Sequence, residues 1–174
     1  MSGRFREMMS RFPTGVAVVT CLDLQGAPQG MTCTSLASVC LDPPTLLVSL
    51  RTASATSAAV AAGTGFAVNL LGGGAHDVAK LFSSPVRDKF ADVCWRPSPH
   101  GHPWLDEDAV AKADCSISQR ATAGDHAIYF GEVVDLTLSA VASPLLYGMR
   151  AYGNWAASAP LPYTRQLGQG GRRE

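Results

Sequence analysis

Apolar and β-branched residues recur along this chain mostly in short runs, which are typical of strands. Residues 14–21 form a β-branched run, and residues 45–50 read as a buried strand. Two longer runs, 109–122 and 126–138, flank Ala123-Gly124-Asp125, where a glycine tolerates the positive φ of a hairpin turn. Further strands are expected at residues 28–32, 66–71 and 145–152.

Helical spacing of apolar residues predicts only short helices. Residues 3–12 carry two phenylalanines and two methionines at helical spacing, with arginines on the other face. Ser54 precedes an alanine-rich run and Gly63 follows it, which predicts a helix between them. Another is expected at residues 75–82, and residues 83–108, rich in proline, are expected to be irregular. Many strands with few short helices favour a β-barrel over a βαβ fold.

The chain has 174 residues, of which 47% are hydrophobic and 16% charged, with a formal net charge of zero. This predicts one globular domain, residues 1–152, followed by a mobile tail, residues 153–174, rich in Gly, Pro, Gln and Arg. No basic patch stands out, so nucleic acid is not an expected partner. No apolar run is long enough to cross a bilayer and no apolar secretory segment is visible, so neither a membrane partner nor secretion is expected.

The spacing of the cysteines and histidines gives no indication of disulfide bonds or of a metal site. The five cysteines are odd in number and lack a Cys-x-x-Cys pair, so they are predicted to be reduced, buried small residues. Reduced cysteines indicate a cytoplasmic protein. His100 and His102 are expected to be loop residues, because no cysteine or carboxylate stands at zinc-site spacing from them; no metal is expected.

Residues 30–44 are the most informative stretch of polar residues. Two threonines and two serines fall within seven residues, and the stretch ends at Asp42-Pro43-Pro44. Small hydroxyl side chains beside backbone N–H groups suit a planar, neutral or anionic ligand. The alternative is a Ser/Thr-rich turn that satisfies its own backbone, and this segment alone favours that alternative.

Several nucleotide-binding and hydrolase motifs are missing. Gly63-Thr64-Gly65 has Val68 where a dinucleotide fingerprint needs its third glycine, and it precedes a strand instead of a helix. No phosphate-binding loop and no Gly-x-Ser-x-Gly occur. A Rossmann nicotinamide domain, a nucleoside triphosphatase and an α/β-hydrolase therefore lose support.

A series of sequence blocks, in order between residues 4 and 152, resembles the flavin reductase family that serves two-component flavin-dependent monooxygenases. No single block is specific, but the ordered series is. The blocks are Arg4-Phe5, residues 11–20, residues 30–44, Ser54-Ala55-Thr56, residues 66–71, Asp88-Lys89-Phe90, residues 124–133 and residues 144–147.

The resemblance implies a mainly β fold: a split β-barrel with a Greek-key core and a few short flanking helices, forming a homodimer with flavin near the subunit interface. It implies hydride transfer from NADH or NADPH to FMN or FAD and release of reduced flavin to a separate monooxygenase. The alternatives are a non-catalytic flavin-binding module, acting as a sensor or electron carrier, and a structural protein with a degenerate pocket. NADH is favoured because no clear Arg/Lys cluster is present, although Arg87 and Arg120 keep NADPH open.

The resemblance also implies the site residues. His126, after the predicted turn, is the expected catalytic residue; it would orient the nicotinamide without transferring a proton. Thr34 departs from the family pattern, in which asparagine is usual, and this bears on the strength or selectivity of flavin binding. The expected flavin-binding residues are Thr32, Cys33, Thr34, Ser35, Ser38, Val39, Ser49, Ser54, Thr56, Lys89, Phe90 and Tyr152.

Several of these residues also fit ordinary structural roles. Ser54 or Thr56 could cap the following helix, bind phosphate at its positive end, or do both. Lys89 could equally be a solvated surface lysine, and His126 a structural histidine. Lys80 is a weaker phosphate candidate, and Tyr147 and Arg150 could border the site or pack elsewhere.

Overall fold

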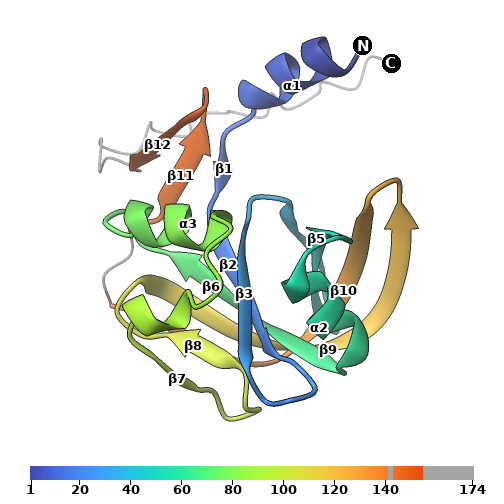
Figure 1. Cartoon of the computed structure of the whole chain (residues 1–174), viewed down its shortest axis with the longest axis vertical. Coiled ribbons are helices and arrows are strands. Elements are labelled where there is room, and N and C mark those ends of the chain that lie inside the picture. Colours follow the sequence, from blue (N-terminus) through green and yellow to red (C-terminus); the bar gives the residue numbers. More distant parts are fainter. Residues whose placement is uncertain (141–142, 155–174) are drawn as a thin grey trace, which may run out of the picture.

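A computed structural model describes residues 1–140 and 143–154 of the chain, and Figure 1 shows its arrangement. The helices of this part are α1 (Ser2–Ser10), α2 (Ala55–Ala62), α3 (His76–Ser83) and a short 3₁₀ turn, η1 (Phe90–Asp92). The strands are β1 (Thr14–Gly15), β2 (Ala17–Leu22), β3 (Pro28–Cys33), β4 (Leu36–Leu41), β5 (Pro44–Arg51), β6 (Gly65–Leu71), β7 (Trp95–Pro97), β8 (Pro103–Leu105), β9 (Ala109–Ala123), β10 (His126–Leu138), β11 (Leu145–Gly148) and β12 (Ala151–Asn154).

Seven strands form one antiparallel sheet in the order β3-β2-β6-β9-β10-β5-β4. Its two edge strands, β3 and β4, follow one another in the chain and meet through Thr34 and Ser35. The backbone N–H of Ser49 in β5 donates to the carbonyl of Ser35 at 3.0 Å, which fixes this junction. The sheet therefore curls back on itself, and the expected mainly β, split-barrel fold with short flanking helices is confirmed.

Strand β2 lies between two hydrophobic cores. Val19 and Cys21 pack in the core that includes α2, whereas Val18, and Val16 directly before the strand, pack in the core that includes α3 and β8. Alternate residues of a strand point to opposite faces, so a strand covered on both faces must be apolar at successive positions. This accounts for the β-branched run at residues 14–21.

The hydroxyl-rich stretch gives a strand that the sequence analysis did not predict. Residues 36–41 form β4, which pairs with β5 at the edge of the large sheet. The hydroxyls of Thr34, Ser35 and Ser38 make no hydrogen bond within the described residues, so the interpretation as a self-satisfied turn is wrong. Because β4 is an exposed edge strand, Cys40 is exposed, contrary to the prediction that the cysteines are buried.

Two other expectations need correction. Residues 145–152 were predicted as one strand, but they turn at Met149 and Arg150, whose φ values are 52° and 61°, between β11 and β12. Residues 83–108 contain the paired strands β7 and β8 as well as irregular segments. Strand β12 runs past the expected domain boundary to Asn154, and the rest of the expected tail lies outside the described residues.

The cysteines of the chain differ in how far they are buried. Cys21, Cys33 and Cys115 are buried, whereas Cys94, like Cys40, is exposed, and all five are free. Burial raises the pKa of the Cys21 and Cys115 thiols to about 12, so both stay protonated. In the described part of the chain, the helices are too short or too polar to span a membrane.

Candidate functional site

A cleft of about 960 Å³ opens along β3, between the N-terminal end of α2 and the loop that follows α3. Both helices contact β3, and Figure 1 shows β3 running between them. The volume is at the upper end of the range of about 300–1,000 Å³ that is usual for small-molecule sites. Ten of the thirteen residues expected at the site line this cleft: Thr32, Cys33, Thr34, Ser35, Ser49, Ser54, Thr56, Lys89, Phe90 and His126.

The structure does not bring Ser38, Val39 and Tyr152 to the cleft. Ser38 and Val39 lie farther along β4, where both are exposed. Tyr152 lies on β12, its ring 5.2 Å from that of Tyr147, and lines a separate hollow of about 330 Å³.

The hydroxyl groups along the cleft are not equivalent. The Thr32 hydroxyl donates to the carbonyl of Ala79 at 2.6 Å and so attaches β3 to α3. The hydroxyls of Thr34 and Ser35 have no protein partner within the described residues. Since each can donate and accept a hydrogen bond, these two are free to bind a ligand.

The N-terminal end of α2 supplies a second polar wall. Ser54 caps the helix: its hydroxyl accepts from the backbone N–H of Ser57 at 3.0 Å and donates to the Arg51 carbonyl at 2.8 Å. The N–H groups of Ala55 and Thr56 have no protein acceptor among the described residues. Free N–H groups and the positive end of a helix dipole favour an anion, so capping and phosphate binding are compatible here.

Lys89 lies on the opposite wall and is tied to the main chain. Its ammonium group donates to the carbonyls of Phe82 at 2.9 Å and Gly30 at 3.4 Å. Burial lowers the pKa of Lys89, because a desolvated ammonium group loses its hydration. Two of its three donors are thus used, which leaves one for a ligand anion; the interpretation as a freely solvated surface lysine is wrong.

An aromatic stack supports that wall. The Phe90 ring lies edge-on to Phe82 at 5.1 Å and to Trp95 at 5.5 Å between ring centroids. Phe90 is buried, so it contributes mainly to packing and exposes little of its ring to the cleft. At Gly30, an added Cβ would come within 2.6 Å of the Phe82 ring, so β3 and α3 can approach this closely only with glycine there.

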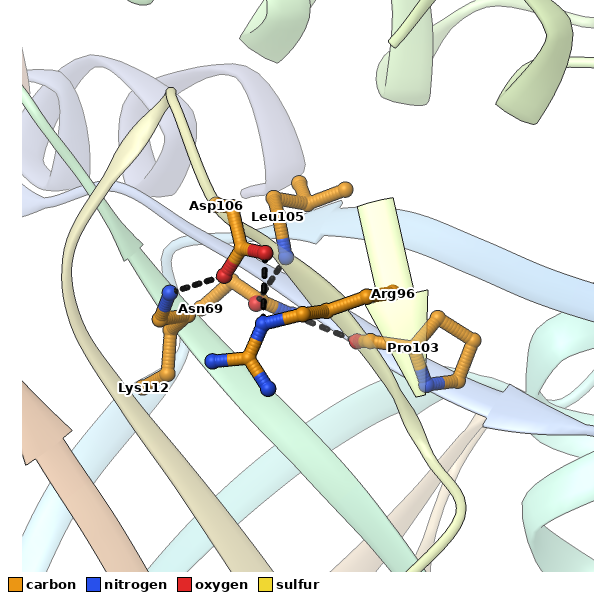
Figure 2. Close-up of polar contacts among 6 residues, drawn as sticks. All are labelled: Asn69, Arg96, Pro103, Leu105, Asp106 and Lys112. Atoms are coloured by element: carbon orange, nitrogen blue, oxygen red, sulfur yellow. Dashed lines mark hydrogen bonds and ion pairs between the residues drawn. The ribbon is translucent and has the colours of Figure 1, made fainter. Parts of the chain in front are cut away.

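Trp95 in turn depends on the β7–β8 hairpin, which polar contacts anchor to the barrel (Figure 2). The buried Asn69 side chain donates to the Pro103 carbonyl at 3.4 Å and accepts from the Leu105 backbone N–H at 2.8 Å. Asp106 accepts from Arg96 at 2.6 Å and from Lys112 of β9. Burial alone would raise the pKa of Asp106, but the hydrogen bonds and charges of Lys112 and Arg96 outweigh it and lower that pKa.

His126 begins β10 and lines the cleft. Its Nδ1 lies 2.8 Å from a carboxylate oxygen of Asp125, and this contact lowers the pKa of Asp125. A carboxylate can only accept, so it selects the tautomer with the proton on Nδ1. Nε2 is then the acceptor with which His126 can contact a ligand.

Arg51 is a cleft residue that the sequence analysis missed. It ends β5, and its backbone lies directly opposite His126 in the sheet. A cation at the end of an apolar strand, just before a helix cap, is the signal that could have identified it. With Arg51, Arg87 and Lys89, the described lining carries three cations and no carboxylate, so the cleft suits an anionic ligand.

Known proteins resemble this chain over almost its whole described length. A family model described as "Flavin reductase like domain" matches residues 9–156. A flavin reductase (NADPH) of Lentzea aerocolonigenes is 51% identical over 86% of this chain and 88% of its own length. An NADH:FAD oxidoreductase of Streptomyces globisporus, solved with NAD and FAD fragments, has a TM-score of 0.85 at 31% identity over 91% of this chain and 94% of its own. Nitrilotriacetate monooxygenase component B of Mycobacterium thermoresistibile has a TM-score of 0.88 at 32% identity over 95% and 93%.

The barrel and its cation-lined cleft therefore belong to an oxidoreductase of the flavin-using class. The chain is a member of the flavin reductase-like family. The resemblance seen in the sequence blocks is confirmed, as is the expected enzyme class, an NAD(P)H-dependent flavin reductase.

Proposed function

We propose that this chain transfers a hydride from NADH or NADPH to FMN or FAD in the cleft and supplies reduced flavin to a separate monooxygenase. The observation that carries the proposal is the cleft itself, which joins free hydroxyls, a helix N-terminus and cations within a flavin reductase-like fold. The bound flavin supplies the acceptor chemistry, and the protein supplies orientation and exclusion of water.

The residues of the cleft fit the parts of a flavin. The hydroxyls of Thr34 and Ser35 would bind the polar edge of the ring or the ribityl chain. The N–H groups of Ala55 and Thr56 and the remaining donor of Lys89 would hold the phosphate from two sides. Thr32, Cys33, Ser49, Ser54 and Phe90 would act by shaping these walls.

His126 would orient the nicotinamide. With its proton on Nδ1, held by Asp125, the imidazole offers Nε2 to the carboxamide N–H₂ group. This positions the donor ring against the acceptor ring, and proximity of that kind is the main contribution a protein can make to hydride transfer.

A monooxygenase partner and a homodimer extend the proposal. The partner is supported by the relative that is itself a monooxygenase component. The homodimer is supported by exposed apolar side chains on α1, directly after α1 and on β4, among them Phe5, Phe12 and Leu41. A dimer that used β4 could bring Ser38 and Val39 to the flavin of its partner.

The five free cysteines support a cytoplasmic location.

Steady-state oxidation of NADH and NADPH with added FMN, FAD or riboflavin tests the proposal. A flavin reductase oxidises reduced nicotinamide with many turnovers per subunit and only when flavin is present. A flavin-binding sensor or electron carrier would quench flavin fluorescence on titration without sustained turnover. A protein that does neither has a degenerate pocket, and the proposal would be wrong.

A further inference from the structure

The three cationic side chains of the cleft differ in the hydrogen bonds that they already make. Lys89 is bonded to two main-chain carbonyls. Arg51, opposite His126 in the sheet, makes no side-chain hydrogen bond or ion pair within the described residues, although its charge contributes to lowering the pKa of Asp125. Arg87 is exposed in the loop after α3 and makes no hydrogen bond or ion pair within the described residues. Arg51 and Arg87 are therefore both available to a ligand, and Arg87 is the one that lies on the wall formed by the loop after α3.

Arg120 is hydrogen-bonded to the main chain outside the cleft. Its guanidinium donates to the carbonyls of Ala61 at 2.7 Å and Gly63 at 2.8 Å, at the C-terminal end of α2. The cleft lies at the other end of this helix, and Arg120 does not line it. Of the two arginines that left NADPH open in the sequence, only Arg87 can reach a nucleotide in the cleft.

We propose that Arg87 binds the 2′-phosphate of NADPH and makes the enzyme prefer NADPH to NADH. The inference rests on the proposed function, since it takes the nicotinamide to lie at His126. His126 and Arg87 come from separate walls of the cleft, one from β10 and the other from the loop after α3. On this proposal, the adenosine of a dinucleotide with its nicotinamide at His126 extends across the cleft to the wall that carries Arg87.

The chemistry of the group supports this assignment. A 2′-phosphate carries up to two negative charges and planar pairs of oxygens, which a guanidinium group binds with two parallel hydrogen bonds. No carboxylate among the described lining residues competes for the guanidinium of Arg87. NADH has a neutral hydroxyl at this position and gains nothing from the charge. This proposal favours NADPH, whereas the sequence analysis favoured NADH.

The test compares wild-type protein with Arg87→Ala, measuring kcat and KM for both dinucleotides at saturating flavin. The ratio of kcat/KM for NADPH to that for NADH should fall about tenfold, mainly through KM for NADPH, which corresponds to ~1.4 kcal/mol. Arg6→Ala, which removes an exposed arginine of α1 outside the cleft, is the matched control and should leave the ratio as it is.

Binding of adenosine 2′,5′-bisphosphate and of 5′-AMP, measured by calorimetry, gives a readout independent of turnover. Wild-type protein should bind the bisphosphate more tightly, and Arg87→Ala should abolish the difference. Equal losses for NADH and NADPH would overturn the proposal, as would an unchanged ratio or a selective loss in Arg51→Ala instead. If wild-type protein oxidises neither dinucleotide with any flavin, the proposed function fails, whatever the bisphosphate titration shows for Arg87.

Discussion

At the scale of single residues, His126 has the best-defined surroundings of the candidate site. Replacing it with alanine removes one neutral hydrogen bond to the nicotinamide, worth about 0.5–1.5 kcal/mol. We expect KM for reduced nicotinamide to rise several-fold, or hydride transfer to slow by a similar factor, while flavin affinity changes little. Steady-state kinetics and flavin titration of the same preparation measure both quantities.

The chain offers a matched control for this variant. His76 on α3 also lies beside an adjacent aspartate, Asp77, at 3.3 Å, but it does not line the cleft. His76→Ala should leave nicotinamide kinetics as in the wild type. If His126→Ala behaves in the same way, or simply fails to fold, His126 has a structural role only.

At the scale of elements, the β7–β8 hairpin depends on Asp106. Asp106→Asn removes a charge that two cations contact, and hydrogen bonds to charged groups contribute about 1.5–3 kcal/mol each. We expect the free energy of unfolding at neutral pH, measured in urea, to fall by about 1–3 kcal/mol. Asp77→Asn, which removes an exposed pair with Lys80, should change it by less than about 0.5 kcal/mol.

The pH dependence follows from the lowered pKa of Asp106. In the unfolded chain this carboxyl group has an ordinary pKa of about 3.9, so the unfolded state binds its proton first as the pH falls. Its contribution is complete above that value and is lost as the pH falls through the folded pKa. Below about pH 4, wild-type protein should therefore lose stability more steeply than Asp106→Asn; parallel curves of urea midpoint against pH would contradict this.

The sequence predicts most elements of this fold, and the exceptions have local causes. β9 and β10 are identified because their runs are long and a glycine turn joins them. β4 is missed because an exposed edge strand needs no alternation of apolar and polar residues. The turn at Met149 and Arg150 lacks the Asn-Gly pair that usually marks such hairpins.

The sequence predicted those cleft residues that are also close to each other in the chain, such as residues 32–35, and Ser54 with Thr56. Phe82 was missed because only packing across the fold brings it to the cleft. The role of Phe90 was also not readable from the sequence: its burial depends on Trp95, and the position of Trp95 depends on a hairpin that local propensity did not predict.

At the scale of the whole molecule, the exposed apolar side of α1 indicates that the protein forms a homodimer. Phe5 and Met8, on the apolar side of this helix, and Phe12, two residues past its end, are each more than half exposed. We expect a homodimer that buries this side, with its mass measured by sedimentation equilibrium. Phe5→Ser with Met8→Ser should weaken association, whereas Leu24→Ser, at an isolated exposed position in the β2–β3 turn, should not. A wild-type monomer at working concentration would contradict the prediction.

Strand β2, which contributes alternate side chains to both hydrophobic cores, also governs how the molecule comes apart. Neither core can lose its packing without exposing one face of the strand that completes the other. The barrel and the layer containing α3 should therefore melt in one cooperative transition, with equal calorimetric and van't Hoff enthalpies for each dissociating unit. The cleft lies where these two layers meet, so partial unfolding that opened it selectively would be rare, and bound flavin would be released by local motion of its walls.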